Sequence, residues 1–294
     1  MTEDESDWLA ARFEEQRAHL RAVSYRMLGS LTEADDAVQE AWLRLSRADS
    51  REIENLGGWL TTVVARVCLN MLHARKSRRE EPAGVHVPDP IVSPHDVSDP
   101  EREALLVDSV GLALLVVLET LTPAERLAFV LHDMFAVSFA EIGPIVDRSP
   151  TAARQLASRA RRRVQGRAPV SDVDLDRQRA VVGAFLEAAR EGDFAALLEV
   201  LDEDVVLRAD RGAAGGSREI RGAIAVAEQA IGFARVARFS RPALVNGAAG
   251  LLTTLGGEPF AVGAVTIRHG RIVEMNILAD PERLRRLKLV VLDD

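Results

Sequence analysis

Residues 138–164 read SFAEIGPIVDRSPTAARQLASRARRRV, and this segment predicts two short helices joined by a tight turn. Ser138 and Glu141 have the spacing of a capping box, in which each side chain reaches the backbone N–H of the other residue. Ser149 followed by Pro150 is typical of the start of a second helix. Two helix starts this close together predict a helix-turn-helix.

The predicted second helix has a small apolar face and a basic polar face. The residues expected to pack inward are Ala153, Leu156, Ala157, Ala160 and Val164. The residues expected to point outward are Thr151, Arg154, Gln155, Ser158 and Arg162, with Arg159, Arg161 and Arg163 on the flanks. A DNA recognition helix needs this division, because residues near its N-terminus contact base edges while later arginines contact phosphates. A solvated surface helix is the alternative.

Two residues in the first helix and the turn restrict the backbone. Pro144 removes a backbone donor, so we expect it to kink or shorten the first helix. Asp147 stands in the turn, where the left-handed conformation is common and Asp tolerates it better than most residues.

Length and charge limit the possible functions. The chain has 294 residues, enough for two or three domains, and a net charge of −8. A nucleic-acid partner would therefore contact local basic segments, and these occur at 66–79 and 148–167. The acidic start and the short apolar run at 112–118 predict a cytoplasmic protein with no signal peptide and no membrane span. The single cysteine, Cys68, excludes an internal disulfide and is expected to be a buried structural thiol.

The first eighty residues predict three helices. The first spans 8–28 and ends at Gly29, and the second starts with Thr32 as its cap. The second helix exposes an acidic face that could be solvated or could dock a basic partner: Asp35, Asp36, Gln39 and Glu40. A turn at 55–58 precedes the third helix, which ends in the basic cluster Arg75, Lys76, Arg78 and Arg79. Four cations in five positions exceed what a helix dipole requires, so a phosphate contact is predicted.

Four blocks in order resemble regions two and four of an extracytoplasmic-function (group IV) RNA polymerase sigma factor. These blocks are LTEADDAVQEAWLRL, GGWLTTVVARVCLNMLHARKSRRE, LTPAERLAFVLHDMF and the helix-turn-helix segment, and they cover roughly the first 165 residues. In the third block, Thr122 and Glu125 have the spacing of a second capping box. The resemblance implies two all-α domains, a helical bundle and a helix-turn-helix, that bind core RNA polymerase and promoter DNA.

The resemblance also implies roles for particular residues. Asp35, Asp36, Gln39 and Glu40 would dock on the clamp helices of the largest polymerase subunit. The helix that meets the downstream promoter element, where the strands open, would use Trp59, Asn70, Arg75, Lys76, Arg78 and Arg79. The helix that reads the upstream element would use Thr151, Ala152, Arg154, Gln155, Ser158, Arg159 and Arg162. Trp59 could stack on an unpaired base or could be a core tryptophan.

A proline-rich stretch and a further domain complete the predicted organisation. We expect region two at 1–80, a linker at 81–100, region four at 101–168 with a helix from Glu101 to Leu118, and an extra domain at 169–294. In a sigma factor such a linker would pass through the polymerase between the two promoter-binding domains.

The extra domain predicts helices followed by a run of antiparallel strands, which gives an α+β fold. Helices are expected at 175–190, 194–201 and 223–234, and strands at 204–210, 241–246, 250–254, 259–268 and 271–278. His269-Gly270 would form a hairpin turn, and 211–217 reads as a loop. The pattern resembles the cone-shaped SnoaL-like, nuclear-transport-factor-2-like fold, and the whole chain resembles the sigma-factor subgroup in which such a domain is fused at the C-terminus and regulates the factor.

Three short segments bear on that subgroup. Residues 85–90, VHVPDP, stand where the subgroup has a Trp-Leu-Pro-Glu-Pro-like motif in the linker. Residues 210–214, DRGAA, stand where it has Asp-Gly-Gly-Gly-Lys, and 280–284, DPERL, loosely resembles its C-terminal Asn-Pro-Asp-x-Leu segment.

Two other classes of protein compete with the sigma factor. One is a ligand-responsive helix-turn-helix transcriptional regulator that acts without binding polymerase, and the other is an enzyme domain fused to a DNA-binding segment. An enzyme would need a complete acid/base set in the last domain, where Asp210 and Glu258 are the candidate carboxylates. We expect no catalysis, because the last domain has no tyrosine and its only histidine, His269, is predicted at a hairpin tip. We expect no metal site and no cofactor, because no Cys/His cluster or phosphate-cradling glycine loop is present in the sequence. A small-molecule or protein ligand of the last domain remains open.

Overall fold

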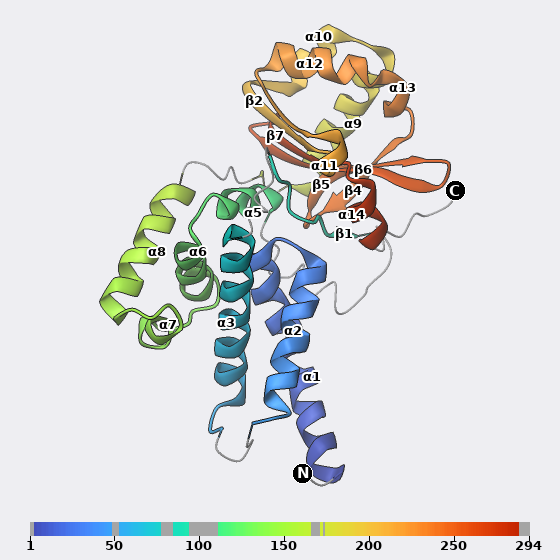
Figure 1. Ribbon diagram of the computed structural model, residues 1–294. Coiled ribbons are helices and arrows are strands. Elements are labelled where there is room, and N and C mark those ends of the chain that lie inside the picture. The colour runs from blue at the N-terminus through green and yellow to red at the C-terminus, as the bar shows by residue number, and fades with distance from the viewer. Residues whose placement is uncertain are drawn as a thin grey trace. The chain divides into compact units, whose positions relative to one another are not determined.

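The computed structural model describes residues 3–48, 53–77, 85–93, 111–165, 171–172 and 174–287. They form two compact units. The first lies within 1–81, 103–107 and 117–166, and the second within 82–102, 108–116 and 167–294. The first unit is helical and the second is α+β (Figure 1), so the predicted fold class is confirmed.

The first unit begins with the helices α1 (Glu3–Leu28), α2 (Leu31–Leu45) and α3 (Leu56–Ser77). Each buries apolar side chains completely, including Leu20, Leu45 and Leu60. Gly29 ends α1 with φ of 69°, as its position predicts. The predicted cap Thr32 is wrong, because Ser30, two residues earlier, occupies the cap position and α2 starts at Leu31.

The helix α3 starts three residues before the predicted position. The Asn55 side-chain oxygen accepts a hydrogen bond from the Gly58 backbone N–H at 3.0 Å, which caps the helix. A Cβ atom on Gly58 would lie 2.9 Å from the Asn55 amide nitrogen. The glycine pair therefore forms the first turn of the helix rather than a turn before it.

The remaining helical elements carry the helix-turn-helix. They are α5 (Leu112–Glu119), whose residues 112–116 belong to the second unit, and, in the first unit, α6 (Pro123–Phe129), the π-helix η2 (Val130–Met134), α7 (Phe139–Ile145) and α8 (Pro150–Val164). Both predicted capping boxes are present, at the start of α6 and at the start of α7. The helix predicted from Glu101 lies outside the described residues as far as Val110, and its last part corresponds to α5.

The turn of the helix-turn-helix follows the sequence prediction. Pro144 lies next to the last residue of α7, which has only seven residues. Asp147 adopts a left-handed conformation with φ of 53°. The Ser149 hydroxyl accepts the Ala152 backbone N–H at 3.2 Å and caps α8.

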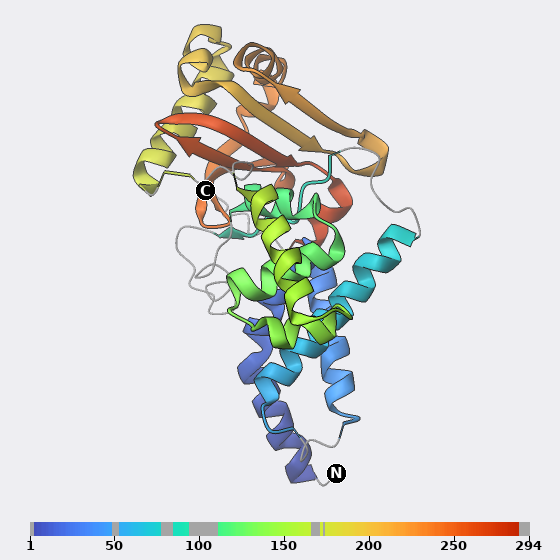
Figure 2. The same cartoon turned by 90° about the vertical axis from the view of Figure 1, so that its left-hand side faces the viewer.

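The second unit contains a sheet with strand order β1-β4-β5-β6-β7-β2-β3. The strands are β1 (Val92–Ser93), β2 (Leu201–Asp210), β3 (Ser217–Arg221), β4 (Ser240–Val245), β5 (Ala248–Leu255), β6 (Glu258–Arg268) and β7 (Arg271–Leu278). The helices are α9 (Leu175–Glu191), α10 (Phe194–Val200), α11 (Gly212–Gly215), α12 (Ala223–Gly232), α13 (Ala234–Ala237) and α14 (Pro281–Arg286). Figures 1 and 2 show α9, α10 and α12 over one face of the sheet and α14 on the other side.

The sheet differs from the predicted antiparallel run in three respects. The strands β2 and β7 pair in parallel, because the chain leaves β2 and returns to its edge only at the end of the domain. Part of the Gly/Ala-rich segment predicted as a loop is the short helix α11, and the strand β3 follows it. The strand β1 comes from the predicted linker and pairs with β4.

Alternation along β2 separates two environments. Val205 and Leu207 face the helices and belong to a buried cluster with Phe185, Leu197 and Met275. Since successive side chains of a strand point to opposite faces, Arg208 and Asp210 lie on the other face of the sheet.

Candidate DNA-binding surfaces and linker site

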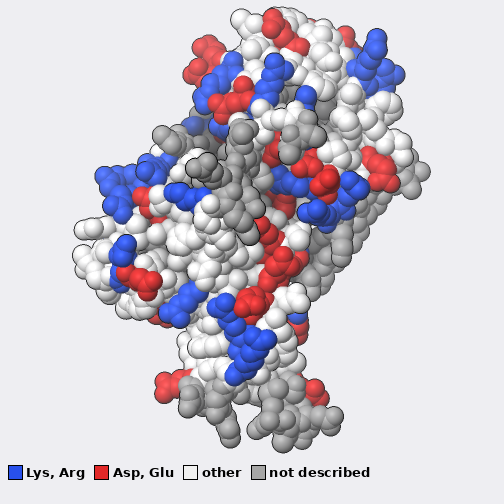
Figure 3. All heavy atoms as spheres, in the orientation of Figure 1, with Lys and Arg blue, Asp and Glu red and all other residues white. Residues whose placement is uncertain are grey.

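The outward side of α8 carries the residues predicted for the upstream promoter element. Ala153, Ala157 and Ala160 are fully buried on its inner side. The exposed residues are Thr151, Arg154, Gln155, Arg159 and Arg162, and the half-buried ones are Ala152 and Ser158. Figure 3 shows Lys and Arg side chains gathered over α8.

Three arginines of α8 also make ion pairs inside the unit. Arg159 Nε lies 3.4 Å from Glu125 Oε1, and Arg163 Nη1 lies 2.9 Å from Glu125 Oε2. Arg161 Nη2 lies 2.5 Å from Asp133. Because the Glu125 side chain is only 6% exposed, the pairs of Arg159 and Arg163 fix α8 against α6, and the Arg161 pair joins α8 to η2. Sequence reasoning assigned Arg159 to DNA alone and did not foresee its pairing with Glu125.

Arg154 has a different neighbour. Its guanidinium lies 5.4 Å from the centre of the Phe139 ring, which holds the side chain by a cation–π contact at the junction of α7 and α8. Arg154 remains exposed there. The side chain is therefore positioned near the N-terminal half of α8, the part of a recognition helix that meets bases.

The helix α3 brings some of the predicted downstream residues to its surface and not others. Asn70 and Lys76 are exposed, and Trp59 is half-buried. Arg75 makes an ion pair with Glu33 of α2 and donates to the Leu28 carbonyl at 3.2 Å, so it ties α3 to the end of α1. Arg78 and Arg79 lie outside the described residues.

The acidic face of α2 is exposed at Asp35, Asp36 and Gln39 and half-buried at Glu40. Figure 3 shows acidic side chains over this helix. Asp35 accepts Arg21 Nε at 2.6 Å, and Glu40 accepts Arg44 Nε at 2.8 Å. Two of the four residues, Asp35 and Glu40, therefore form ion pairs with arginines of the same unit.

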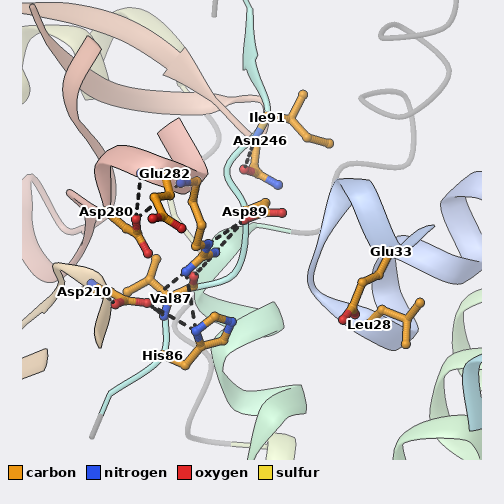
Figure 4. A network of polar contacts seen from close by, with 12 residues as sticks. Leu28, Glu33, His86, Val87, Asp89, Ile91, Asp210, Asn246, Asp280 and Glu282 are labelled. Carbon is orange, nitrogen blue, oxygen red and sulfur yellow. Dashed lines mark hydrogen bonds and ion pairs between the residues drawn. The ribbon is translucent and has the colours of Figure 1, made fainter. Parts of the chain in front are cut away.

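A buried ion-pair network joins the predicted linker to the α+β domain. Arg283 of α14 donates from Nε to Asp89 Oδ1 at 2.9 Å and from Nη1 to Asp210 Oδ2 at 2.9 Å. Its Nη2 donates to the Val87 carbonyl at 2.6 Å, and His86 Nδ1 lies 3.2 Å from Asp210 Oδ2. Figure 4 shows His86, Val87, Asp89 and Asp210 converging, with Asp210 contributed by the end of β2.

Asp210 is held ionised in this network. Burial alone would raise its pKa, but hydrogen bonds from His86 and from the N–H groups of Val87 and Gly212, with the charge of Arg283, lower it to about 2. The carboxylates of Asp89 and Asp210 are each 6% exposed. Both therefore depend on nearby donors and cations in place of water.

The linker is fixed again beyond Asp89. The Ile91 N–H donates to the Asn246 side-chain oxygen at 3.0 Å, and the Asn246 N–H donates back to the Ile91 carbonyl at 2.8 Å. Val92 then pairs with Val245 as β1 joins β4. All residues from Val87 to Val92 are buried. This part of the linker is thus built into the second unit.

The turn between β7 and α14 positions Arg283. Asp280 caps α14 by accepting the Glu282 N–H at 2.9 Å and the Arg283 N–H at 3.3 Å. A Cβ atom on Gly212 would lie 2.4 Å from Asp280 Oδ2, and Gly212 has φ of 72°. Glycine is therefore required beside this cap. The sequence signals for this site were the segments 85–90, 210–214 and 280–284. The resemblance pointed to each segment, but it could not show that the three meet in the folded domain.

A cavity of about 550 Å³ lies on the opposite face of the sheet, between the strands and the helices α9, α12 and α13. Neither Asp210 nor Glu258, the carboxylates considered for catalysis, lines it. Asp210 belongs to the linker network, and Glu258 is exposed at the start of β6. His269 forms the predicted hairpin tip with φ of 54°.

The remaining candidate features are the cysteine, possible metal ligands and possible membrane spans. Cys68 is fully buried, and burial raises the pKa of its thiol to about 12, as expected for a structural thiol. Within the described ranges, no three His, Cys, Asp or Glu side chains are grouped as metal ligands. None of the helices that the structure describes is long and apolar enough to cross a bilayer.

Comparisons with known proteins match most of the chain. The family model for Sigma-70 region 2 matches residues 13–80, and the one for Sigma-70 region 4 matches 111–164. The chain is 37% identical over 292 residues to the ECF RNA polymerase sigma factor SigJ of Mycobacterium tuberculosis H37Rv, covering 93% of this chain and 92% of that protein. It is 34% identical to the probable ECF RNA polymerase sigma factor SigI of M. tuberculosis CDC 1551, covering 96% and 97%. The crystal structure of M. tuberculosis SigJ superposes with a TM-score of 0.77 at 35% identity, covering 94% of this chain and 98% of that one.

Proposed function

The chain belongs to the family of extracytoplasmic-function RNA polymerase sigma factors, and from that premise we propose how its surfaces divide the work of transcription initiation. As a sigma factor, it acts with core RNA polymerase on promoter DNA. The regulator that never binds polymerase is the weaker alternative, because such a protein has no use for region two.

The outward side of α8 reads the upstream promoter element. The observation that carries this assignment is the exposed basic side of a helix whose inner side is closely packed alanine, in a chain with a net charge of −8. Arg154 is the candidate for a base contact, and Arg162 for a phosphate contact. Arg159 divides its charge between DNA and Glu125.

The first three helices contact the downstream element and the polymerase. Trp59, Asn70 and Lys76 form the described part of the downstream surface, with Arg75 behind them and Arg78 and Arg79 beyond the described residues. The acidic side of α2, exposed at Asp35, Asp36 and Gln39 and half-buried at Glu40, docks on the clamp helices of the largest polymerase subunit. The factor works in the cytoplasm, where these partners are.

The α+β domain regulates the factor by holding its linker. A sigma-factor linker has to pass through the polymerase between the two promoter-binding domains, whereas residues 85–93 here are bound along their length. The support is the Arg283 network together with the Ile91–Asn246 pair and the β1–β4 pairing. Release of the linker would then accompany assembly with polymerase. We propose domain boundaries at 80, 100 and 168, and no catalytic role for the last domain.

A run-off transcription assay with core polymerase tests this function. The full-length chain should confer promoter-specific transcription, and a chain ending at Gly166 should change that activity. Arg154→Ala should relax discrimination at one base pair, by about 1–3 kcal/mol for a bidentate contact. A chain that binds promoter duplex tightly alone, and never co-purifies with core polymerase, would favour the independent regulator.

A further inference from the structure

The cavity of the second unit is apolar over most of its wall. Phe185 and Leu186 of α9 line it from one side, and Leu207, Leu251 and Met275 line it from the sheet. Protein interiors seldom leave voids much larger than a water molecule, and this space has roughly the volume of 18 water molecules at about 30 Å³ each. Its volume lies in the range of small-molecule sites, which is about 300–1,000 Å³.

Small side chains create this space. Alanines contribute to the wall from both the helices and the sheet: Ala189, Ala209, Ala230, Ala237, Ala261 and Ala279. A larger apolar side chain at several of these positions would close the cavity and add to the hydrophobic core. The small side chains therefore keep the cavity open, and the domain loses the van der Waals contacts that larger side chains would make there.

Two arginines mark the mouth of the cavity. Arg211 and Arg218 both line it and are exposed, whereas Leu186, Leu207 and Met275 are buried, so the arginines lie at the open end. The Arg211 guanidinium lies 5.5 Å from the centre of the Phe233 ring.

The charge at this mouth is unbalanced. Arg218 Nη1 donates to the Gln229 side-chain oxygen at 3.2 Å. No Asp or Glu side chain is among the described residues that line the cavity. The open end therefore carries two cations next to an apolar interior.

We infer that this cavity binds an amphipathic carboxylate, with its apolar body against the sheet and its carboxylate at Arg211 and Arg218. The planar guanidinium presents paired N–H donors that match a carboxylate. Most of the wall is apolar, and the Ser240 and Thr253 hydroxyls that also line it are hydrogen-bonded to each other at 2.8 Å. This inference rests on the proposed regulatory role of the domain and specifies the kind of molecule that its cavity takes.

Isothermal titration calorimetry with the full-length chain tests the inference, with dodecanoate as the probe below its micelle concentration. Dodecanoate should bind saturably at one site, and dodecan-1-ol, of the same length without the charge, should bind at least tenfold more weakly. Arg211→Ala and Arg218→Ala should each weaken dodecanoate binding about tenfold, the size expected for the loss of a charge-assisted hydrogen bond.

Two further variants separate the cavity from general effects of charge. Arg221→Ala is the matched control, because Arg221 lies on the same strand as Arg218 three residues away, faces the other side of the sheet and pairs with Glu219 at 2.8 Å. It should leave dodecanoate binding unchanged. Ala261→Phe should fill the cavity and abolish binding while circular dichroism shows an intact fold.

Three results would overturn the inference: no saturable binding of dodecanoate, equal binding of dodecan-1-ol, or equal losses in Arg218→Ala and Arg221→Ala. The titration contains neither polymerase nor promoter. A failed titration would therefore contradict the ligand inference without bearing on the proposed sigma-factor function. A failed transcription assay would likewise not bear on ligand binding.

Discussion

Replacing Arg283 by Ala should release the linker from the α+β domain. The substitution removes the cation that joins Asp89 and Asp210, two carboxylates that are each 6% exposed. Breaking a buried ion pair by removing one partner costs about 3–5 kcal/mol, because the remaining charge stays buried. Asp210 keeps its hydrogen bond from the Gly212 N–H group when the segment opens, whereas Asp89 can regain water by leaving its site.

The cost can therefore be relieved by opening of the segment 85–93. If the free energy of opening falls by about 3 kcal/mol, the population of the open segment rises roughly 100-fold, since about 1.4 kcal/mol corresponds to a factor of ten. Two amide protons report this directly. The Val87 N–H donates to Asp210 at 3.1 Å and the Ile91 N–H donates to Asn246 at 3.0 Å in the closed segment.

Hydrogen exchange followed by mass spectrometry measures the effect. Peptides that cover residues 85–93 should exchange roughly 100-fold faster in Arg283→Ala than in the original chain, while peptides from α8 keep their rates. Arg286→Ala is the matched control, because Arg286 is an exposed residue of the same helix. In the run-off assay, Arg283→Ala should also need less protein than the original chain to reach the same transcript level.

Two outcomes would refute this reasoning. One is unchanged protection of the linker in Arg283→Ala, which would mean that the ion pairs contribute nothing to holding it. The other is the same loss of protection in Arg286→Ala, which would point to general destabilisation of α14. Asp89→Asn offers an independent check, because it keeps the shape of the side chain and should still accelerate exchange at Ile91.

Three further predictions follow from single contacts. Arg162→Ala should lower the salt slope of promoter binding by about 0.9 and leave the melting temperature unchanged. Arg163→Ala should lower the melting temperature, because it removes a partner of buried Glu125. Equal melting temperatures in the two variants would contradict this assignment. The pKa of Asp210 is about 2 in the folded protein, against an ordinary value of 3.8. Its contribution of about 2 kcal/mol to the free energy of unfolding is therefore present above pH 4 and lost as the pH falls towards 2. Urea titrations should show this loss in the original chain and not in Asp210→Asn. Gly212→Ala should destabilise the second unit by about 1–2 kcal/mol or more, because φ is positive and Cβ meets a carboxylate, and an unchanged melting temperature would disprove that requirement.

Local chemistry explains where the sequence predicted structure well. The caps of α7 and α8 depend on residues three positions apart, and the left-handed Asp147 lies in the same short segment. The His269-Gly270 hairpin likewise depends on two adjacent residues. By contrast, the parallel pairing of β2 with β7 joins residues about 70 positions apart, such as Leu207 and Met275, and no local signal encodes it.

The sequence by itself determined the helix-turn-helix, the basic outer side of its second helix and the order of the helical and α+β parts, because these depend on spacing and composition along short stretches. Only the tertiary structure decided that Arg159 and Arg163 share Glu125, and that Asp89 meets Arg283 across 194 positions of chain. An arginine's charge is visible in the sequence, but its partner is set by which surfaces the fold brings together and removes from water.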